Sequence, residues 1–299
     1  MIRVPFTKLA GAGNDFVLVD TLQDPLRPLA ARWRAVAKSL CDRRRGVGAD
    51  GLLVLGRSRT ADVRMRIFNP DGSEPSMCGN GIRCLAWYAH RRGEAGRRFS
   101  IQTNAGVKRA QVLSGSRVRI DMGAPRLLGR WPGASFGSPR ITEAVLVDSG
   151  VPHLVCWVDD MAAVNVGELG RRLRRHVRLR PAGANVDFIR AVSAAQATLS
   201  NRLRLSMRTY ERGVEGETQA CGTGAVAAAA AAAARALEGG ARAARFRVDV
   251  LVPGGLLRVT VEARRATGGQ RGVVFSHALL EGEARQVARG TVTWNGRRP

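Results

Sequence analysis

Alternating hydrophobic and polar positions predict a chain built mainly from short strands. Apolar and polar residues alternate over 63–68 and over 203–210, which is the two-residue period of a half-buried strand. Shorter apolar runs and alternations predict further strands at 15–20, 52–55, 98–103, 107–113, 117–122, 246–252, 256–262 and 271–277. Helical spacing stands out over Pro28–Asp42 and directly after Met77 and Ala220. The pattern indicates an α+β fold dominated by strands.

The second half of the chain repeats the order of elements found in the first. Met65-Arg66-Ile67-Phe68 corresponds to Met207-Arg208-Thr209-Tyr210, and a Cys-Gly-x-Gly element then opens the main helix of each half. We therefore predict two similar α+β domains, residues 1–126 with 279–299 and residues 127–278. The segment 124–140, rich in Gly, Pro and Ser, is expected to be the loop at their boundary.

Length and composition favour a globular protein. The chain has 299 residues, of which 45% are hydrophobic, enough for a substantial core. No apolar run reaches the roughly 18–20 residues of a membrane span, and the first residues lack the apolar segment of a signal peptide. We therefore expect a soluble, cytoplasmic protein that does not contact membranes.

The net charge of +24 raises the question of a nucleic-acid partner. All but three of the 48 basic residues are arginine, and they are scattered along the chain without interleaved aromatic residues. This distribution does not favour nucleic-acid binding as the main function, although a basic nucleic-acid-binding protein stays an alternative. The charge can also attract anionic substrates.

Two of the five cysteines are candidates for chemistry. Cys41, Cys84 and Cys156 lie in apolar contexts and are expected in the core, and no spacing fits a metal site or a disulfide framework. Cys78 and Cys221 instead stand just ahead of helix starts, where unpaired backbone N–H groups stabilise a thiolate and lower the thiol pKa. One such motif is compatible with a structural cysteine; two at matching places favour a function.

Two thiols that face each other across a cleft would suit inversion of a carbon stereocentre. One thiolate removes a proton and the opposite thiol returns one from the other face, which is two-base acid–base catalysis. The helix starts would bind the substrate carboxylate and stabilise the developing carbanion, so that no cofactor and no metal is expected. Pyridoxal phosphate would need a Schiff-base lysine, and Lys8, Lys38 and Lys108 all lie outside the two motifs.

Other polar residues have two interpretations each. His153 is either a turn residue ahead of a strand or a group that tunes a thiol. Glu211 and Arg212 either form a surface ion pair or bind the ammonium and carboxylate groups of a substrate. Ordinary turn or strand-end positions are expected for the asparagines, namely Asn14, Asn69, Asn80 and Asn185. Gly46–Gly51 fits GxGxxG, but it follows a helix and precedes a strand, the reverse of a dinucleotide site.

The chain resembles the diaminopimelate epimerase family. The resemblance runs in order over about the first 250 residues, and the residues after about 265 match poorly. It rests on Gly11-Ala12-Gly13-Asn14-Asp15-Phe16, Phe68-Asn69-Pro70-Asp71-Gly72-Ser73-Glu74, Met77-Cys78-Gly79-Asn80-Gly81, Pro152-His153, Ala184-Asn185-Val186, Tyr210-Glu211-Arg212-Gly213 and Glu217-Thr218-Gln219-Ala220-Cys221-Gly222-Thr223-Gly224.

The resemblance implies a fold and a site. The implied fold is two pseudo-symmetric α/β domains, each a curved, mainly antiparallel sheet around a central helix. The reaction is cofactor-independent epimerisation of LL-2,6-diaminopimelate to meso-diaminopimelate, with Cys78 and Cys221 as the catalytic pair. A homodimer is left open. The family's substrate contacts map to Asn14, Asn69, Gly79, Asn80, Asn185, Glu211, Arg212, Gly222 and Thr223, and its thiol-tuning groups to His153 and Glu211.

This chain departs from the family pattern at three places. Gly51 and Val151 replace amides that many members carry, and the segment from Glu211 to Cys221 is one residue longer than the commonest form. The main alternative is another cofactor-independent racemase of the same fold, acting on proline or hydroxyproline. Asn80 favours the diaminopimelate enzyme, because proline-racemase relatives usually have His at that position.

Overall fold

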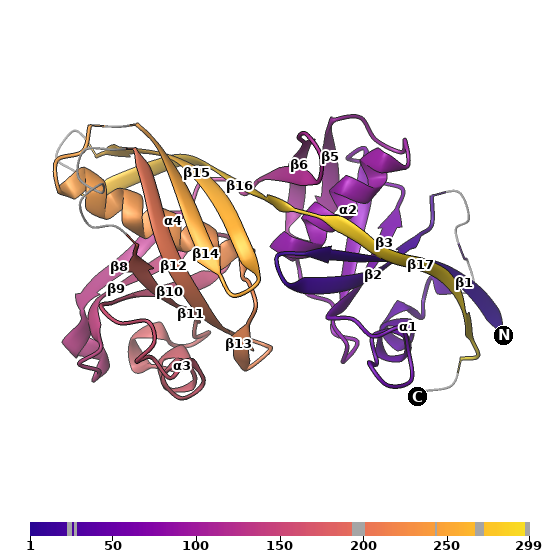
Figure 1. The fold of residues 1–299 in the computed structure, drawn as a ribbon, viewed down its shortest axis with the longest axis horizontal. Helices are drawn as coiled ribbons and strands as arrows, with labels where there is room; N and C mark the ends of the chain where they lie inside the picture. The colour runs from indigo at the N-terminus through magenta and orange to yellow at the C-terminus, as the bar shows by residue number, and fades with distance from the viewer. Residues whose placement is uncertain (23–25, 27–28, 193–200, 243, 267–271, 297–299) are drawn as a thin grey trace. The chain divides into compact units, whose positions relative to one another are not determined.

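The computed structural model divides the chain into two compact units (Figure 1). One unit comprises Met1–Ile120 with Gly282–Pro299, and the other comprises Asp121–Glu281. The structure describes the whole chain except residues 23–25, 27–28, 193–200, 243, 267–271 and 297–299.

The discontinuous unit carries Cys78 and is dominated by strands. Its elements are β1 (Ile2–Gly11), β2 (Asn14–Asp20), α1 (Trp33–Leu40), β3 (Gly51–Gly56), β4 (Val63–Phe68), α2 (Gly79–Arg91), β5 (Arg98–Thr103), β6 (Gly106–Val112), β7 (Arg117–Asp121) and β17 (Arg285–Trp294).

The continuous unit carries Cys221. Its elements are β8 (Arg126–Pro132), a 3-10 turn (Gly133–Phe136), β9 (Ile141–Asp148), β10 (Pro152–Val158), α3 (Val166–Arg174), a second 3-10 turn (Val177–Leu179), β11 (Asn185–Ala191), β12 (Arg202–Glu211), β13 (Gly216–Thr218), α4 (Gly222–Glu238), β14 (Arg245–Val252), β15 (Gly255–Arg265) and β16 (Val273–Glu283).

Both units use the same sequence of strand pairings. In the discontinuous unit the paired strands follow the order β17, β1, β2, β3, β4, β5, β6, β7. The pairs β2–β3 and β4–β5 are parallel, and the other five pairs are antiparallel. In the continuous unit the paired strands follow the order β8, β9, β10, β11, β12, β14, β15, β16. The third and fifth pairs, β10–β11 and β12–β14, are again parallel, and the other five pairs are antiparallel. The predicted fold of two similar, mainly antiparallel α+β halves is confirmed.

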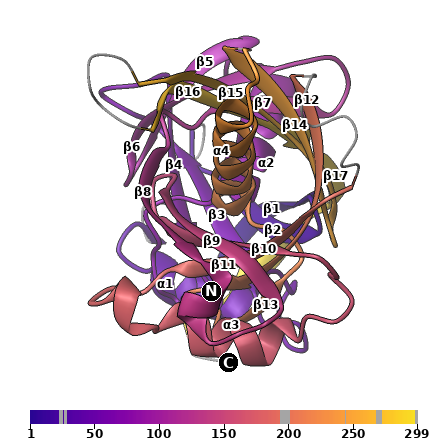
Figure 2. The same ribbon diagram turned by 90° about the vertical axis from the view of Figure 1, so that its left-hand side faces the viewer.

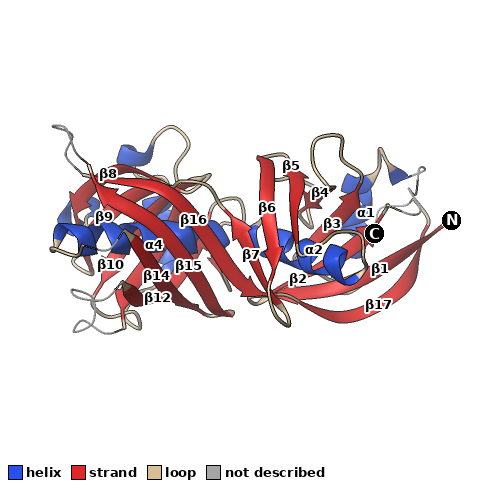
Figure 3. Cartoon of the chain, turned by 90° about the horizontal axis from the view of Figure 1, so that it is seen from above, coloured by secondary structure: helices blue, strands red, loops and turns tan. Residues whose placement is uncertain are grey.

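A single long helix packs inside the sheet of each unit (Figures 2 and 3). α2 contacts β1, β2, β3, β4 and β6, and α4 contacts strands from β9 to β15. In α4 the alanines from Ala227 to Ala234 are all buried, so over this stretch the helix presents only small side chains to the strands around it. Alanine also has the highest helix propensity, which suits a helix without a polar face. No helix in the described part of the chain is both long and apolar enough to span a membrane.

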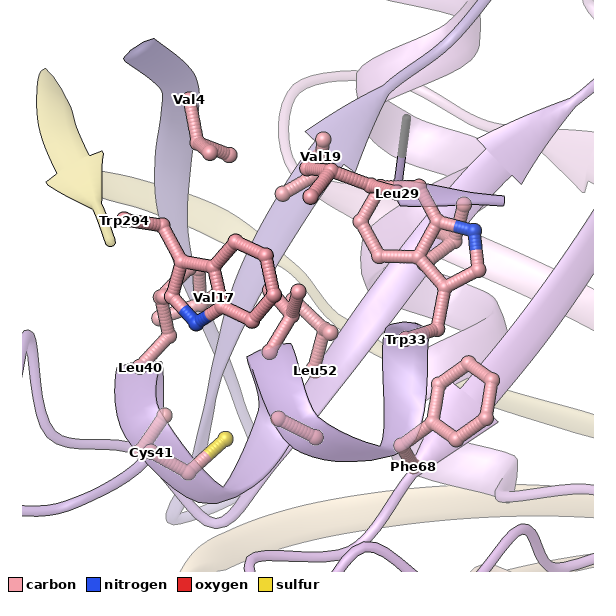
Figure 4. Packing of buried hydrophobic residues seen from close by; sticks show 14 of the residues in the cluster. Val4, Val17, Val19, Leu29, Trp33, Leu40, Cys41, Leu52, Phe68 and Trp294 are labelled. Carbon is pink, nitrogen blue, oxygen red and sulfur yellow. The ribbon is translucent and has the colours of Figure 1, made fainter. Parts of the chain in front are cut away.

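α1 closes a separate core on the discontinuous unit. Trp33, Val36, Ala37 and Leu40 form its buried face, as the apolar spacing predicts. They pack against residues of β1, β2, β3 and the end of β17 (Figure 4). The cluster includes Val4, Val17, Val19, Leu29, Leu52, Phe68 and Trp294. α1 therefore packs against β2 and β3, the strands that begin at Asn14 and Gly51.

The structure corrects two sequence predictions and adds one helix that the sequence did not predict. The helix predicted over Pro28–Asp42 begins only at Trp33, because the preceding turn is closed by three-residue bonds such as Arg32 N–H to Leu29 O; Pro28 itself lies outside the described residues. The segment 124–140 is not a loop, since β8 pairs with β9. α3 was not predicted, although Asn165 caps it by accepting from the Glu168 N–H.

Candidate active site

Cys78 and Cys221 occupy the same position at the start of the central helix of their unit. Each has extended backbone and is the N-cap of its helix. The Sγ of Cys78 accepts from the Gly81 N–H at 3.5 Å, and the Sγ of Cys221 accepts from the Gly224 N–H at 3.4 Å. Each thiol therefore lies at the positive end of a helix dipole.

The surroundings of Cys78 are organised by two asparagines. The Asn80 side-chain amide donates to Asn14 Oδ1, and Asn14 Nδ2 donates to Asp50 Oδ2 at 3.0 Å. Asn80 is buried and is the second residue of α2, not a turn residue as the sequence suggested. These contacts fix the β1–β2 turn against the first turn of α2.

Asn69 belongs to a different local structure within this unit. Its side-chain amide donates to the Ser73 hydroxyl at 2.9 Å, in the turn between β4 and α2. Gly79 is buried at the first position of α2. The structure thus joins Asn14 to Asn80 directly and places Asn69 in the neighbouring loop.

The surroundings of Cys221 contain a chain of hydrogen bonds that starts at a buried carboxylate. Asp187 Oδ2 lies 2.7 Å from His153 Nδ1, and both side chains are fully buried. His153 Nε2 lies 2.9 Å from the Thr223 hydroxyl, which is itself 3.3 Å from the Cys221 Sγ. The predicted turn position of His153 is wrong, because β10 carries this residue into the interior.

The surroundings of His153 determine which ring nitrogen carries the proton. The Asp187 carboxylate only accepts, so Nδ1 donates to it; Thr209 donates to the other carboxylate oxygen at 2.7 Å. Asn185 accepts from the Arg212 N–H through Oδ1, so its Nδ2 is the donor that lies 3.2 Å from His153 Nε2. Nε2 is therefore an acceptor, and Thr223 donates to it as well. The Thr223 oxygen is left to accept from the Cys221 S–H. The chain of bonds therefore holds Cys221 as a protonated thiol.

Asn185 connects this chain of bonds to the end of β12. Its Oδ1 accepts from the Arg212 backbone N–H at 2.8 Å, and its Nδ2 lies 3.2 Å from His153 Nε2. Arg212 donates from its guanidinium to Ala182 O at 3.2 Å, so the predicted surface ion pair with Glu211 is not observed. Hydrogen bonds of the Asn185 side chain therefore link His153 to the backbone of Arg212.

The environment of Cys221 raises the pKa of its thiol well above the ordinary value. Burial is the main cause, and the negative charges of Glu211 and Asp187 add to it. The hydrogen bond from the Gly224 N–H acts in the opposite direction but is outweighed. Burial likewise raises the pKa of Glu211. The sequence-based expectation of a lowered pKa is therefore wrong for Cys221, because desolvation exceeds the effect of the helix start.

The other cysteines are core residues, as predicted. Cys41, Cys84 and Cys156 are buried free thiols, and burial raises the pKa of Cys41 and of Cys84 to about 12. Within the described residues, no group of three or more metal-ligating side chains is assembled.

Asp187 is the functional candidate that sequence reasoning missed. It lies two residues after Asn185 on β11, between the buried apolar residues Val186 and Phe188, and a fully buried acid in such a place needs a partner. Gly224 makes room for it, because a Cβ built there would come within 2.5 Å of Asp187 Oδ1. The acid in the apolar run was the available signal, but its partner came from another strand.

The repeated α+β unit carries one helix-capping thiol in each copy, and comparison with known proteins identifies the chain as an isomerase. The model of the family described as diaminopimelate epimerase matches residues 6–128 and 145–274. The chain therefore belongs to the diaminopimelate epimerase family. A diaminopimelate epimerase of Methanothrix thermoacetophila is 40% identical, over 98% of this chain and 97% of the relative. One of Moorella thermoacetica is 43% identical, over 74% and 81%.

Solved structures show the same fold at low sequence identity. A phenazine biosynthesis protein of the PhzF family from Bacillus anthracis has a TM-score of 0.71 at 17% identity, over 98% of this chain and all of that chain. A hydroxyproline epimerase from Agrobacterium vitis has a TM-score of 0.65 at 17% identity, over 97% and 91%. At such identities the likeness concerns the fold alone.

Proposed function

We propose that this protein converts LL-2,6-diaminopimelate to meso-diaminopimelate, with Cys78 and Cys221 acting on opposite faces of one α-carbon. The observation that carries the proposal is the duplicated cap, in which a cysteine Sγ accepts from the third helical N–H of each central helix. One thiol as thiolate removes the α-proton, and the other as neutral thiol returns a proton. Membership of the diaminopimelate epimerase family is the reason for choosing diaminopimelate as the substrate.

The helix starts supply the electrostatics that a reaction without an electron sink needs. The first backbone N–H groups of a helix have no partner within it, so Gly79–Asn80 and Gly222–Thr223 offer donors for the substrate carboxylate. Charge that develops on that carboxylate in the transition state is stabilised by the same donors. Asn14, Asn69 and Glu211 are proposed to contact the substrate as well, and His153 to tune Cys221 through Thr223.

The alternatives receive less support. The hydroxyproline epimerase shares the fold but only 17% of residues, whereas diaminopimelate epimerases share about 40%. A main function in nucleic-acid binding would leave both capping cysteines and the buried Asp187–His153 pair unexplained. Cytoplasmic location and a homodimer stay predictions from the sequence.

Solvent-deuterium incorporation tests the reaction and its cofactor independence together. In D₂O the enzyme should introduce deuterium at the epimerised α-carbon of LL- and meso-diaminopimelate, followed by NMR, and leave proline and hydroxyproline unlabelled. Dialysis against EDTA and addition of pyridoxal phosphate should leave the rate unchanged. Labelling of proline without labelling of diaminopimelate would replace the proposal by the racemase alternative.

Arg212 should contribute to substrate binding through its guanidinium. One Nη1–H donates to Ala182 O, and among the described residues the rest of the planar fork has no protein partner. Lysine cannot reproduce a two-pronged contact with a carboxylate. Losing a hydrogen bond to a charged group costs about 1.5–3 kcal/mol, so Arg212→Lys should lower kcat/KM at least about tenfold. Arg178→Lys, on an exposed turn, is the control; an unaltered kcat/KM in Arg212→Lys would remove Arg212 from the site.

A further inference from the structure

Arg83 is a fully buried arginine in the unit that carries Cys78. It lies on α2, five residues after Cys78, and its side chain is 0% exposed. The guanidinium bends back toward the helix start, where Nη1 donates to Gly79 O at 2.9 Å and Nη2 donates to Asn80 Oδ1 at 2.7 Å. Its Nε has no hydrogen-bond partner. The positive charge therefore lies against the first turn of α2, hydrogen-bonded to the two residues that follow Cys78.

No carboxylate among the described residues pairs with this charge. A guanidinium stays protonated in proteins, and burying it without a counter-charge is costly. The groups that interact electrostatically with Arg83 are two thiols, Cys78 and Cys84. Burial raises the pKa of Cys84 to about 12, so Cys84 stays neutral. Cys78, which is only partly buried, is left as the group able to supply a negative charge.

The strands packed against α2 bring no acid to Arg83. Asp15 on β2 pairs with Lys8 on β1 at 2.9 Å, and Asp20 accepts from Tyr88, further along the helix, at 3.3 Å. β3 contains no ionisable side chain. The remaining ionisable residues of β1, β4 and β6 are basic: Arg3, Arg64, Arg66, Lys108 and Arg109. Beyond Cys84 and Tyr88, α2 itself adds only His90 and Arg91, both in its last turn.

We infer that Arg83 is the positioning residue that holds Cys78 as a thiolate in the resting enzyme. The other unit has the opposite arrangement. The residue five positions after Cys221 is Val226, and Cys221 has the acids Glu211 and Asp187 nearby. Cys78 therefore rests as the base and Cys221 as the acid, so that the free enzyme is prepared for the diastereomer whose α-proton faces Cys78. This inference rests on the proposed two-thiol function.

Alkylation of the thiols measures their protonation state without any substrate. The full-length enzyme is treated with iodoacetamide between pH 5 and 10, and peptides that contain Cys78 and Cys221 are quantified by mass spectrometry. In the wild type the alkylation of Cys78 should have its midpoint below that of Cys221 and below the ordinary thiol value of about 8.5. A Cys78 midpoint at or above that value would overturn the inference, with no variant needed.

Substitutions at Arg83 then identify the cause. Arg83→Met should raise the Cys78 midpoint by about one pH unit or more, a roughly tenfold loss of thiolate below the midpoint. Arg83→Lys, which keeps the charge, should retain most of the low midpoint. Arg91→Met, which removes an exposed charge from the same helix, should leave it unchanged. Circular dichroism confirms that each variant is folded.

The outcomes separate this inference from the proposed function. An unchanged Cys78 midpoint in folded Arg83→Met, with KM for diaminopimelate raised, would mean that Arg83 serves the substrate carboxylate and not the thiol. Failure of the wild type to label diaminopimelate, together with the expected midpoint shift, would contradict the proposed substrate alone.

Discussion

Replacing either capping cysteine should abolish epimerisation of both diastereomers. In Cys78→Ala or Cys221→Ala one face of the α-carbon has no acid or base, and the loss of a positioned proton-transfer group costs about 10²- to 10⁴-fold in rate. The two directions of the reaction exchange the roles of the thiols, so each variant should fail from LL- and from meso-diaminopimelate. Chiral chromatography of the products after long incubation measures the residual rate.

Serine variants separate loss of chemistry from loss of the helix cap. Removing an N-cap acceptor costs about 0.5–2 kcal/mol of stability, and each Sγ accepts from a helical N–H. Cys78→Ser and Cys221→Ser keep an acceptor, yet their hydroxyls do not ionise near neutral pH, so they should be as inactive as the alanine variants. Cys41→Ala, which removes a core thiol, should remain active. Near-normal turnover in either serine variant would contradict the two-base mechanism.

The fold was predictable because its strongest signals are local and repeated. The alternation over 63–68 and 203–210 and the two Cys-Gly-x-Gly elements are short patterns, and β4, β12, α2 and α4 lie where these patterns place them. Duplication made each weak signal stronger. The central helices also follow from local rules, since the cap, the glycines and the alanine run all favour helix at those positions.

The parts that escaped prediction depend on contacts between distant segments. β8 forms because β9 supplies its partner, and its own residues alternate only between half-buried and exposed positions. His153 was placed in a turn because Pro152 precedes it, whereas β9 and β11 on either side draw it into the sheet. The shifted pKa of Cys221 is likewise invisible in the sequence, because desolvation is a property of the folded environment.

The two thiols are equivalent in sequence and different in surroundings. Both cap a helix, so the local dipole is the same for each. The difference comes from side chains that neither motif contains: Glu211 and Asp187 act on Cys221, and Arg83, outside the Cys-Gly-x-Gly residues, acts on Cys78. In the proposed reaction these charges, placed on other elements or deeper in the helix, give the two repeated thiols different roles in proton transfer.

Asp187→Asn should lower kcat about ten- to a hundred-fold while changing KM little. The asparagine amide can donate to His153 Nδ1, which moves the ring proton to Nε2 and reverses the bond to Thr223. Thr223 would then donate to Cys221 and no longer accept from it, so the thiol loses the arrangement that holds its proton. A hydrogen bond to a charged group is worth about 1.5–3 kcal/mol, which sets the scale of the effect. Steady-state kinetics with LL- and meso-diaminopimelate provides the measurement.

A structural explanation of the same loss predicts a different result. If Asp187 only stabilised β11, then Asp187→Asn would lower the melting temperature, and the folded fraction would keep its kcat. Thr209→Val removes the other partner of the carboxylate but leaves His153 Nδ1 donating to it, so this variant should lose stability and keep most of its kcat. Asp249→Asn, on the exposed pair with Arg258, makes the same chemical change away from the site. Equal kcat in Asp187→Asn and Asp249→Asn would show that the carboxylate does not act through His153 on Cys221.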